Sequence, residues 1–148
     1  MSIEADLTLS VTHLVRDACL CLHTQRAARA LARRFDEAFR SLGLTNGQFS
    51  LLMSLNRPEP PTLGSVAALL AMDRTTLTAA LKPLERRKLV KVAIDKKDRR
   101  SRRLALTAAG RALLANAVPI WKAEHAALEQ ELASFPLPDL RAALIKMA

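Results

Sequence analysis

The chain has 148 residues, of which 50% are hydrophobic and 25% charged, and its formal net charge is +9. This length suits one domain with a buried core, and the apolar content excludes a disordered chain. No stretch approaches the ~20 apolar residues of a membrane span, Met1–Leu9 lacks the basic residues of a secretory signal, and two cysteines make no disulfide framework. We therefore expect a cytoplasmic protein with no membrane partner.

Residues 10–42 predict one long amphipathic helix. At about 100° per residue, most apolar side chains share one face and the arginines share the opposite face. The apolar face carries Leu14, Cys21, Ala28, Leu31, Ala32, Phe35, Phe39 and Leu42, and the basic face carries Arg26, Arg29, Arg33 and Arg40. Gly43 is expected to end the helix in a left-handed conformation.

Three short helices are expected next. Thr45 and Gln48 fit a capping box for a helix over 47–55, and the proline-rich segment 56–61 ends it. Thr62 is expected to cap a second helix that ends near Ala71. Asp73 is expected to cap a third over 74–87, in which Pro83 should kink the last turn.

A period of two then replaces the helical period. Val90, Val92 and Ile94 are apolar at alternate positions, as are Leu104 and Leu106. This pattern predicts two antiparallel strands with one apolar face. The connection over 95–101 has six charged residues in seven and is expected to project into solvent.

Two helices complete the chain. Thr107 is expected to cap a long helix to about Ser134, in which Pro119 should introduce a bend. Its apolar seam follows a heptad spacing, typical of a helix that packs along another helix, at Leu114, Val118, Trp121, His125, Leu128 and Leu132. A terminal helix over 139–147 places Leu140, Leu144 and Met147 on one face.

Positive charge is concentrated in one segment. Residues 82–103 hold eleven of the 23 basic residues and three acidic ones, so they carry +8 of the formal +9. Such a field favours a polyanionic partner, above all double-stranded DNA. The alternative is a solvated charge run without a partner.

The order helix, turn, helix, strand, charged loop, strand predicts a winged helix-turn-helix in a mainly α fold with a small antiparallel β-hairpin wing. Small hydroxyl side chains on the helix over 74–87, the second helix of this motif, suit base edges in the major groove, and its basic residues suit phosphates. The predicted DNA contacts are Arg74, Thr75, Thr76, Thr78, Lys82 and Arg86 on the helix and Arg99, Arg100 and Arg102 on the wing. The alternative is an ordinary amphipathic helix in an all-helical core.

Within the wing, Asp98 is expected to hold an arginine by a charge-assisted pair and so fix the shape of the loop. Arg99 and Arg100 at the tip suit a minor groove, whose width arginine reads. For Lys96 and Lys97 we favour a mobile, solvated hairpin tip.

Two runs of sequence resemble the MarR family of regulators. The run RTTLTAALKPLERRKLV at 74–90 resembles the family's recognition helix, and DRRSRRLALTAAG at 98–110 resembles its wing. Lys88 departs from the pattern, because members usually have glycine there, which bears on the local backbone conformation. The resemblance implies an obligate homodimer with interlocked terminal helices, a palindromic operator, and an effector bound between the dimer and DNA-binding parts. The dimerisation region would comprise 10–42 and 108–148, and the DNA-binding domain 45–107.

The candidate residues for an effector or redox site are Cys19, His23, Arg26, Trp121 and His125. The arginine face of the first helix suits a small anionic or aromatic effector. Cys19 lies where the hydroperoxide-sensing branch of the family has its reactive cysteine, but the tyrosines of that branch are absent here. In one regular helix, Cys19 and Cys21 would point apart and could not form a disulfide. An inert thiol, half of a metal site with His23, and a simple interface role for His125 are the alternatives.

Three functions remain open from sequence. The leading one is a dimeric DNA-binding regulator, which the family resemblance implies to be a repressor. It is expected to have no catalytic activity, cofactor or metal, because no nucleophile elbow, phosphate loop or metal cluster is present. The second is an oxidant-sensing repressor that acts through Cys19. The third is a winged-helix interaction module that does not read DNA.

Overall fold

The computed structural model describes residues 7–148 as a mainly helical chain with one β-hairpin, which confirms the predicted fold class. The elements are α1 (Leu9–Ala18), α2 (Leu20–Ala38), a 3-10 turn (Arg40–Leu42), α3 (Asn46–Ser54), α4 (Leu63–Leu69), α5 (Arg74–Arg86), β1 (Val90–Ile94), β2 (Arg102–Leu106), α6 (Ala108–Glu131) and α7 (Leu137–Met147). Within the described range no helix is long and apolar enough to cross a membrane. The interpretation of Met1–Leu9 lies mostly outside that range.

The prediction of a single helix over 10–42 is wrong, because the helix is interrupted at Cys19. This residue has ψ of 110°, an extended backbone, and α2 starts afresh after it. The Cys19 sulfur takes the position of a helix cap and accepts the Leu22 N–H at 3.4 Å. Hydrophobic periodicity continues through the break, so it indicates the shared face but not the continuity of the backbone.

The predicted helix caps after residue 42 rest on local hydrogen bonds, and the structure confirms them, whereas α4, α5 and α6 end one to three residues before the predicted positions. Gly43 is left-handed, with φ of 62°. Thr45 and Gln48 form the complete capping box before α3. The side chains of Thr62, Asp73 and Thr107 cap α4, α5 and α6 by accepting the N–H three residues further on, at 3.1, 2.7 and 3.0 Å.

One hydrophobic core joins the C-terminal part of α2 to α3, α4, α5, the hairpin and α6. Its fully buried side chains are Phe39, Leu52, Val66, Leu77, Leu81, Leu84 and Leu104. Each fully buried leucine or phenylalanine contributes roughly 1.5–3 kcal/mol relative to exposure. This core therefore fixes the position of α5 and of the hairpin that follows it.

The predicted seam of α6 packs against α2 and α3 within the chain. An aromatic cluster lies at this contact and consists of Phe35, Phe39, Phe49, Trp121 and His125. Phe39 stacks on Phe49 with ring centroids 4.7 Å apart, and Trp121 stacks on His125 at the same separation. The seam is thus occupied by the chain's own helices along most of its length.

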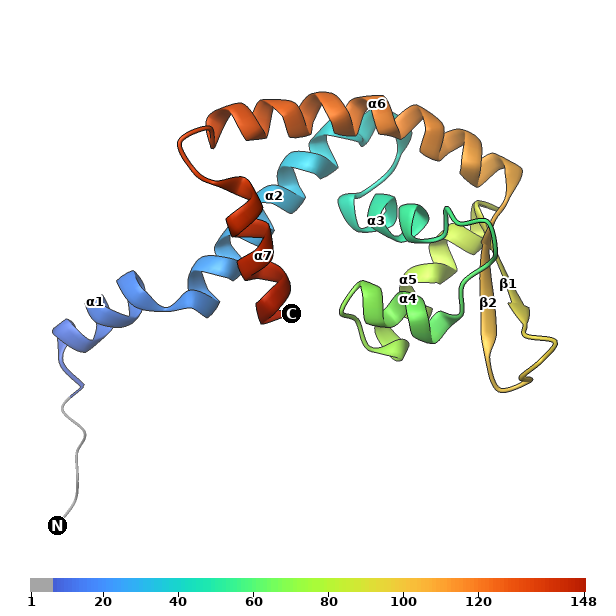
Figure 1. Cartoon of the computed structure of the whole chain (residues 1–148), viewed down its shortest axis with the longest axis horizontal. Coiled ribbons are helices and arrows are strands. Elements are labelled where there is room, and N and C mark those ends of the chain that lie inside the picture. Colours follow the sequence, from blue (N-terminus) through green and yellow to red (C-terminus); the bar gives the residue numbers. More distant parts are fainter. Residues whose placement is uncertain (1–6) are drawn as a thin grey trace, which may run out of the picture.

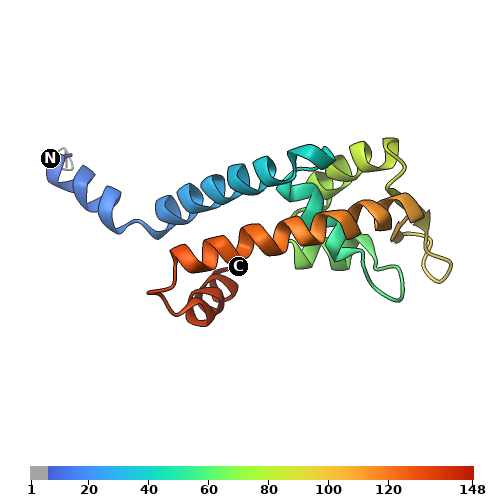
Figure 2. The same cartoon turned by 90° about the horizontal axis from the view of Figure 1, so that it is seen from above.

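The two ends of the molecule differ in packing. Figure 1 shows α6 spanning the chain, with the hairpin at one end and α1 extending from the other, and Figure 2 shows the same separation from above. No residue of α1 or α7 is buried. The hairpin end is therefore a packed unit, whereas the end with α1 and α7 presents uncovered apolar side chains.

Candidate nucleic-acid interface

Helix α5 separates its side chains as predicted. Leu77, Leu81 and Leu84 are buried in the core. The predicted contact residues Arg74, Thr75, Thr76, Thr78, Lys82 and Arg86 are all exposed. The hairpin that follows α5 rules out the alternative of an all-helical core. A helix with one uncovered face of small hydroxyl residues and cations is suited to enter a DNA groove.

The hydroxyl groups on this face are not equally free. Thr76 Oγ1 donates to Asp73 Oδ2 at 2.8 Å, and Thr78 Oγ1 donates to the Arg74 carbonyl at 2.7 Å. The Thr76 backbone N–H and hydroxyl hold the pKa of Asp73 below its usual value. Thr76 therefore contributes to the cap of α5, and Thr75 has the hydroxyl that these bonds leave available.

Arg87 has a structural contact that the sequence did not predict. Helix α5 continues through Pro83 to Arg86, one residue short of the predicted end. The Arg87 guanidinium then donates to the Gly43 carbonyl at 2.7 Å. One of the eleven basic residues of the charged segment thus joins α5 to the turn after α2.

The wing is a two-stranded antiparallel hairpin, as predicted, although Ile94 at the end of its apolar face pairs with Arg102 and is 58% exposed. Val90 pairs with Leu106 and Val92 with Leu104. A short third element supports it, because the Leu104 N–H donates to the Pro61 carbonyl at 2.9 Å and Thr62 bridges to Arg103. The hairpin is therefore anchored to the start of α4, and only its tip is free to meet a partner.

Two aspartates shape the tip, and the predicted role of Asp98 needs correction. Its Oδ1 accepts the Arg100 backbone N–H at 3.0 Å, and no ion pair links it to an arginine in residues 7–148. The charge-assisted pair is made by Asp95 with Arg103, at 3.3 Å. A backbone N–H two residues away is closer to the Asp98 carboxylate than any guanidinium on a solvated tip.

The expectation that all of 95–101 projects into solvent is wrong for Asp95, which is 9% exposed. Its carboxylate accepts the Lys97 N–H at 3.1 Å, and this bond, followed by the Arg103 guanidinium, lowers its pKa. Arg103 also donates to the Pro60 carbonyl at 3.0 Å. Asp95 therefore fixes the base of the loop. The density of charged residues around it in the sequence did not indicate that this carboxylate would be buried.

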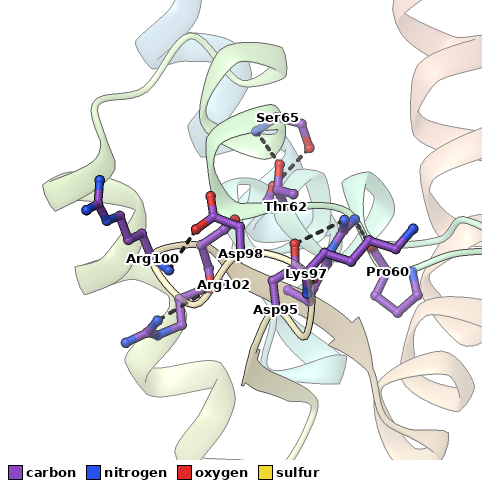
Figure 3. Close-up of polar contacts among 10 residues, drawn as sticks. Pro60, Thr62, Ser65, Asp95, Lys97, Asp98, Arg100 and Arg102 are labelled. Carbon is purple, nitrogen blue, oxygen red and sulfur yellow. Dashed lines mark hydrogen bonds and ion pairs between the residues drawn. The ribbon is translucent and has the colours of Figure 1, made fainter.

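The basic tip remains exposed, at Lys96, Lys97, Arg99 and Arg100, with Arg102 beside it. Arg102 Nη1 makes only long contacts, to the carbonyls of Arg99 at 3.3 Å and Ser101 at 3.4 Å. Figure 3 shows Asp98, Arg100 and Arg102 around one turn of the wing, next to Thr62 and Ser65 at the start of α4. Arg74 at the start of α5 lines one small cleft together with Arg100 and Arg102 of the wing.

The residues predicted for an effector fall into two separate places. On α2, His23 and Arg26 are exposed and border a shallow depression of about 520 Å³ with Arg29 and Arg33. The His23 ring donates through Nδ1 to the Cys19 carbonyl at 2.7 Å. Cys19 is half-buried at the helix break, so the angular argument that placed it opposite Cys21 no longer holds.

On α6, Trp121 and His125 are half-buried and stacked, and His125 Nδ1 lies 3.5 Å from Glu129. Trp121 also borders an apolar cleft of about 560 Å³ between α3, the end of α4 and α6. Its other apolar lining residues are Phe49, Met53, Leu69, Leu70 and Val118, and Lys122 adds a cation. Sequence reasoning identified Trp121 but did not assemble this cleft, because three helices contribute to it.

Comparison with known proteins supports this geometry. The MarR family model matches residues 44–101. The chain is 39% identical to the transcriptional regulator MosR of M. tuberculosis in a complex with DNA, with a TM-score of 0.78 over 87% of this chain and 92% of MosR. It is 31% identical to the transcriptional repressor CouR bound to a 23-mer DNA duplex, with a TM-score of 0.70 over 90% and 92% of the two chains.

A curated relative points the same way. The transcriptional activatory protein BadR of Rhodopseudomonas palustris is 34% identical over 89 residues, which cover 58% of this chain and 51% of BadR. The matched region thus spans about half the length of BadR. These relatives are transcriptional regulators and not enzymes. The winged helix-turn-helix, the family match and these likenesses together show that the chain belongs to the MarR family of DNA-binding transcriptional regulators.

Proposed function

We propose that the chain acts as a homodimeric repressor that binds a palindromic operator and is released by a small effector. The single observation that carries this proposal is the shared exposed surface of α5 and the basic wing. Residues 45–107 would form the DNA-binding domain, and 10–42 with 108–148 the dimerisation region. In a two-fold dimer, the two α5 helices would enter major grooves about one DNA turn, ~34 Å, apart.

Within this interface, the available hydroxyl of Thr75 suits a base edge, and Lys82 and Arg86 suit phosphates. Arg99, Arg100 and Arg102 would contact the neighbouring minor groove or its phosphates. Selection from random duplexes tests the proposal directly, and recovered operators should be palindromic. Binding should weaken steeply with salt, because several phosphates are neutralised. Failure to enrich any duplex sequence would contradict the proposal.

Point variants test the wing. Arg100→Ala should cost about 1–3 kcal/mol of operator affinity if the tip is inserted. Lys96→Ala is the matched control, because Lys96 is equally exposed but is assigned to the solvated part of the tip. Equal effects of the two substitutions would mean that the wing contributes only general charge.

The direction of regulation is testable separately. CouR is a repressor, whereas BadR is an activatory protein, and the likeness to CouR extends over nearly the whole of both chains. Transcription in vitro from a promoter that contains the selected operator should fall when the protein is added. An increase would assign activation instead.

The apolar cleft bordered by Trp121 is the better of the two candidate effector places. Its lining comes from three helices and is mostly apolar, and Lys122 supplies one cation for an anionic, apolar effector. Trp121 is the single tryptophan, so its fluorescence reports on the cleft. Salicylate and benzoate should quench it and release DNA, and Met53→Ala should weaken both effects. Arg26→Ala serves as the control on α2; if it abolishes release instead, the arginine face is the effector site.

Oxidant sensing through Cys19 is the second candidate, and the helix break favours it. The Cys19 sulfur accepts an N–H at the start of α2, where the helix dipole favours negative charge. Attack of the thiolate on a hydroperoxide would break the O–O bond, form a sulfenic acid and release an alcohol. Cys19→Ser should keep DNA binding and lose release by cumene hydroperoxide. Release that is unchanged would discard this candidate.

A further inference from the structure

A small polar cleft lies between the wing and the two helices of the helix-turn-helix. Its volume is about 210 Å³, and its lining residues include Thr62 and Gly64 of the α4 start, Arg74 of α5, and Asp98, Arg100 and Arg102 of the wing. Three segments that are separated in sequence thus meet around one space.

Gly64 allows Arg74 to reach this cleft. A Cβ atom built on Gly64 would lie 3.0 Å from Arg74 Nη2, 3.7 Å from Cζ and 4.0 Å from Nε. The end of the Arg74 guanidinium therefore lies against the backbone of α4, and a methyl group at position 64 would push Nη2 away by a few tenths of an ångström. Gly64 does not have a positive φ, so close approach, and not backbone freedom, is its distinguishing feature.

The charges in the cleft favour an anion. Arg74, Arg100 and Arg102 supply three guanidinium groups, and Asp98 supplies the one carboxylate. That carboxylate already accepts the Arg100 N–H at 3.0 Å. The contacts of Arg102 to its own loop are 3.3 and 3.4 Å long, so they are weak enough to be exchanged for a phosphate oxygen.

We infer that this cleft binds one phosphate of the operator backbone, with Arg74 as its ligand from the recognition helix and Arg100 and Arg102 as its ligands from the wing. Gly64 is a positioning residue, because its missing Cβ leaves room for the Arg74 guanidinium beside α4. This inference rests on the proposed DNA binding by α5 and the wing. A phosphate held from both sides would lock the wing to the recognition helix, which sets register on the duplex without reading a base.

Gly64→Ala tests the inference, and Gly47→Ala is its matched control. Both glycines are the second residue of a short helix, but a Cβ at Gly47 meets only Thr45 Oγ1 at 4.0 Å. Alanine favours helix in both places, so neither variant should melt below the wild type. Gly64→Ala should weaken operator binding about tenfold and lower the salt slope by about one phosphate contact. Gly47→Ala should change neither quantity.

Arg74→Gln provides a second route that does not depend on Gly64. It should give the same loss of affinity and salt slope, and the double variant with Gly64→Ala should lose no more than either single variant. Replacement of single operator phosphates by neutral methylphosphonates should identify one position that matters in the wild type and no longer matters in Arg74→Gln.

The outcomes separate the two proposals. If the wild type enriches no operator, the proposed function fails. If the wild type binds its operator and Arg74→Gln binds with the same affinity and salt slope, the cleft is not a phosphate site. If only Gly64→Ala keeps both quantities, Gly64 does not position Arg74. Additive losses in the double variant would likewise overturn the inference, because Gly64 would then act independently of Arg74.

Discussion

At the scale of single residues, the junction between α5, β1 and α6 depends on two backbone requirements. Lys88 has φ of 57°, the left-handed conformation that the family pattern meets with glycine. Its carbonyl accepts the Thr107 hydroxyl at 2.6 Å, and the Leu89 carbonyl accepts the Thr107 N–H at 3.0 Å. Gly110 lies against the same segment, since a Cβ there would be 2.0 Å from the Leu89 oxygen. The departure at Lys88 thus changes the residue and leaves the left-handed turn in place.

Gly110→Ala should therefore destabilise the chain by about 2–3 kcal/mol, because the new methyl group overlaps a buried backbone. Urea unfolding followed by circular dichroism measures this loss. Gly47→Ala, on an open helix position, should leave stability equal or slightly higher. A Gly110→Ala variant as stable as the wild type would mean that α6 can move away from Leu89 at no cost.

Lys88→Gly should act in the opposite direction. The left-handed conformation costs a non-glycine residue roughly 1–2 kcal/mol, and the greater freedom of glycine in the unfolded chain offsets about half of it. The net expectation is a gain of about 0.5–1 kcal/mol in the free energy of unfolding, measured in the same urea titration. A loss of stability would show that the exposed lysine side chain makes a contribution larger than its strain.

At the scale of elements, Arg34 holds α2 against α6. Its guanidinium bonds both Glu131 oxygens, at 2.7 and 2.8 Å, and its Nε bonds Glu124. The two glutamates raise the pKa of Arg34 above its usual value, and the bonds from Arg34 lower the pKa of Glu131. This bidentate clamp joins α2 to α6 in addition to the aromatic cluster, whose Phe35 and His125 are adjacent in sequence to Arg34 and Glu124.

Because of this clamp, we expect the free energy of unfolding to decrease at acidic pH. Because the folded state lowers the pKa of Glu131, its stabilisation is complete above the pKa of the unfolded chain and is lost as pH falls through the folded-state pKa. Arg34→Met should flatten the decline of unfolding free energy below about pH 5. Arg141→Met, which removes the longer 3.7 Å contact to Glu129, is the control. Parallel curves for Arg34→Met and the wild type would mean that the clamp adds no stability.

At the scale of the whole molecule, the uncovered apolar residues are concentrated away from the wing. Leu9, Leu14, Leu20, Leu144, Ile145 and Met147 are between 43% and 77% exposed. The start of α2 and the end of α7 also border a groove of about 550 Å³ that is lined mostly by apolar atoms. Apolar surface gathered in this way marks an interaction site, and a second copy of the chain is the proposed occupant.

Leu144→Glu should therefore shift the chain from dimer to monomer in sedimentation velocity experiments at micromolar concentration. Ile94→Glu is the matched control, because Ile94 is 58% exposed on the wing and lies outside the proposed interface. A wild type that sediments as a monomer, or a Leu144→Glu variant that remains a dimer, would remove this surface from the dimer interface.

Local chemistry determined what the sequence alone could predict. The caps at Thr45, Thr62, Asp73 and Thr107, the turn at Gly43 and the antiparallel hairpin involve residues close together in the chain, and each appeared as predicted. The division of α5 into a buried and an exposed face follows from helical periodicity for the same reason. The exposure of the candidate DNA contacts on α5 could therefore be predicted from the sequence.

Tertiary packing decided the remainder. The Arg34–Glu131 clamp joins residues 97 positions apart, and the Gly64–Arg74 contact depends on how two helices cross. Asp95 is buried because Arg103 and the Lys97 N–H meet its carboxylate, although the five residues that follow it, 96–100, are all charged. The break at Cys19 leaves the hydrophobic period intact and so has no signature in the pattern. The spacing of residues indicates the face of a helix or strand on which a side chain lies. Its contact partner depends on which distant segments pack against that face, and this is determined only by the tertiary structure.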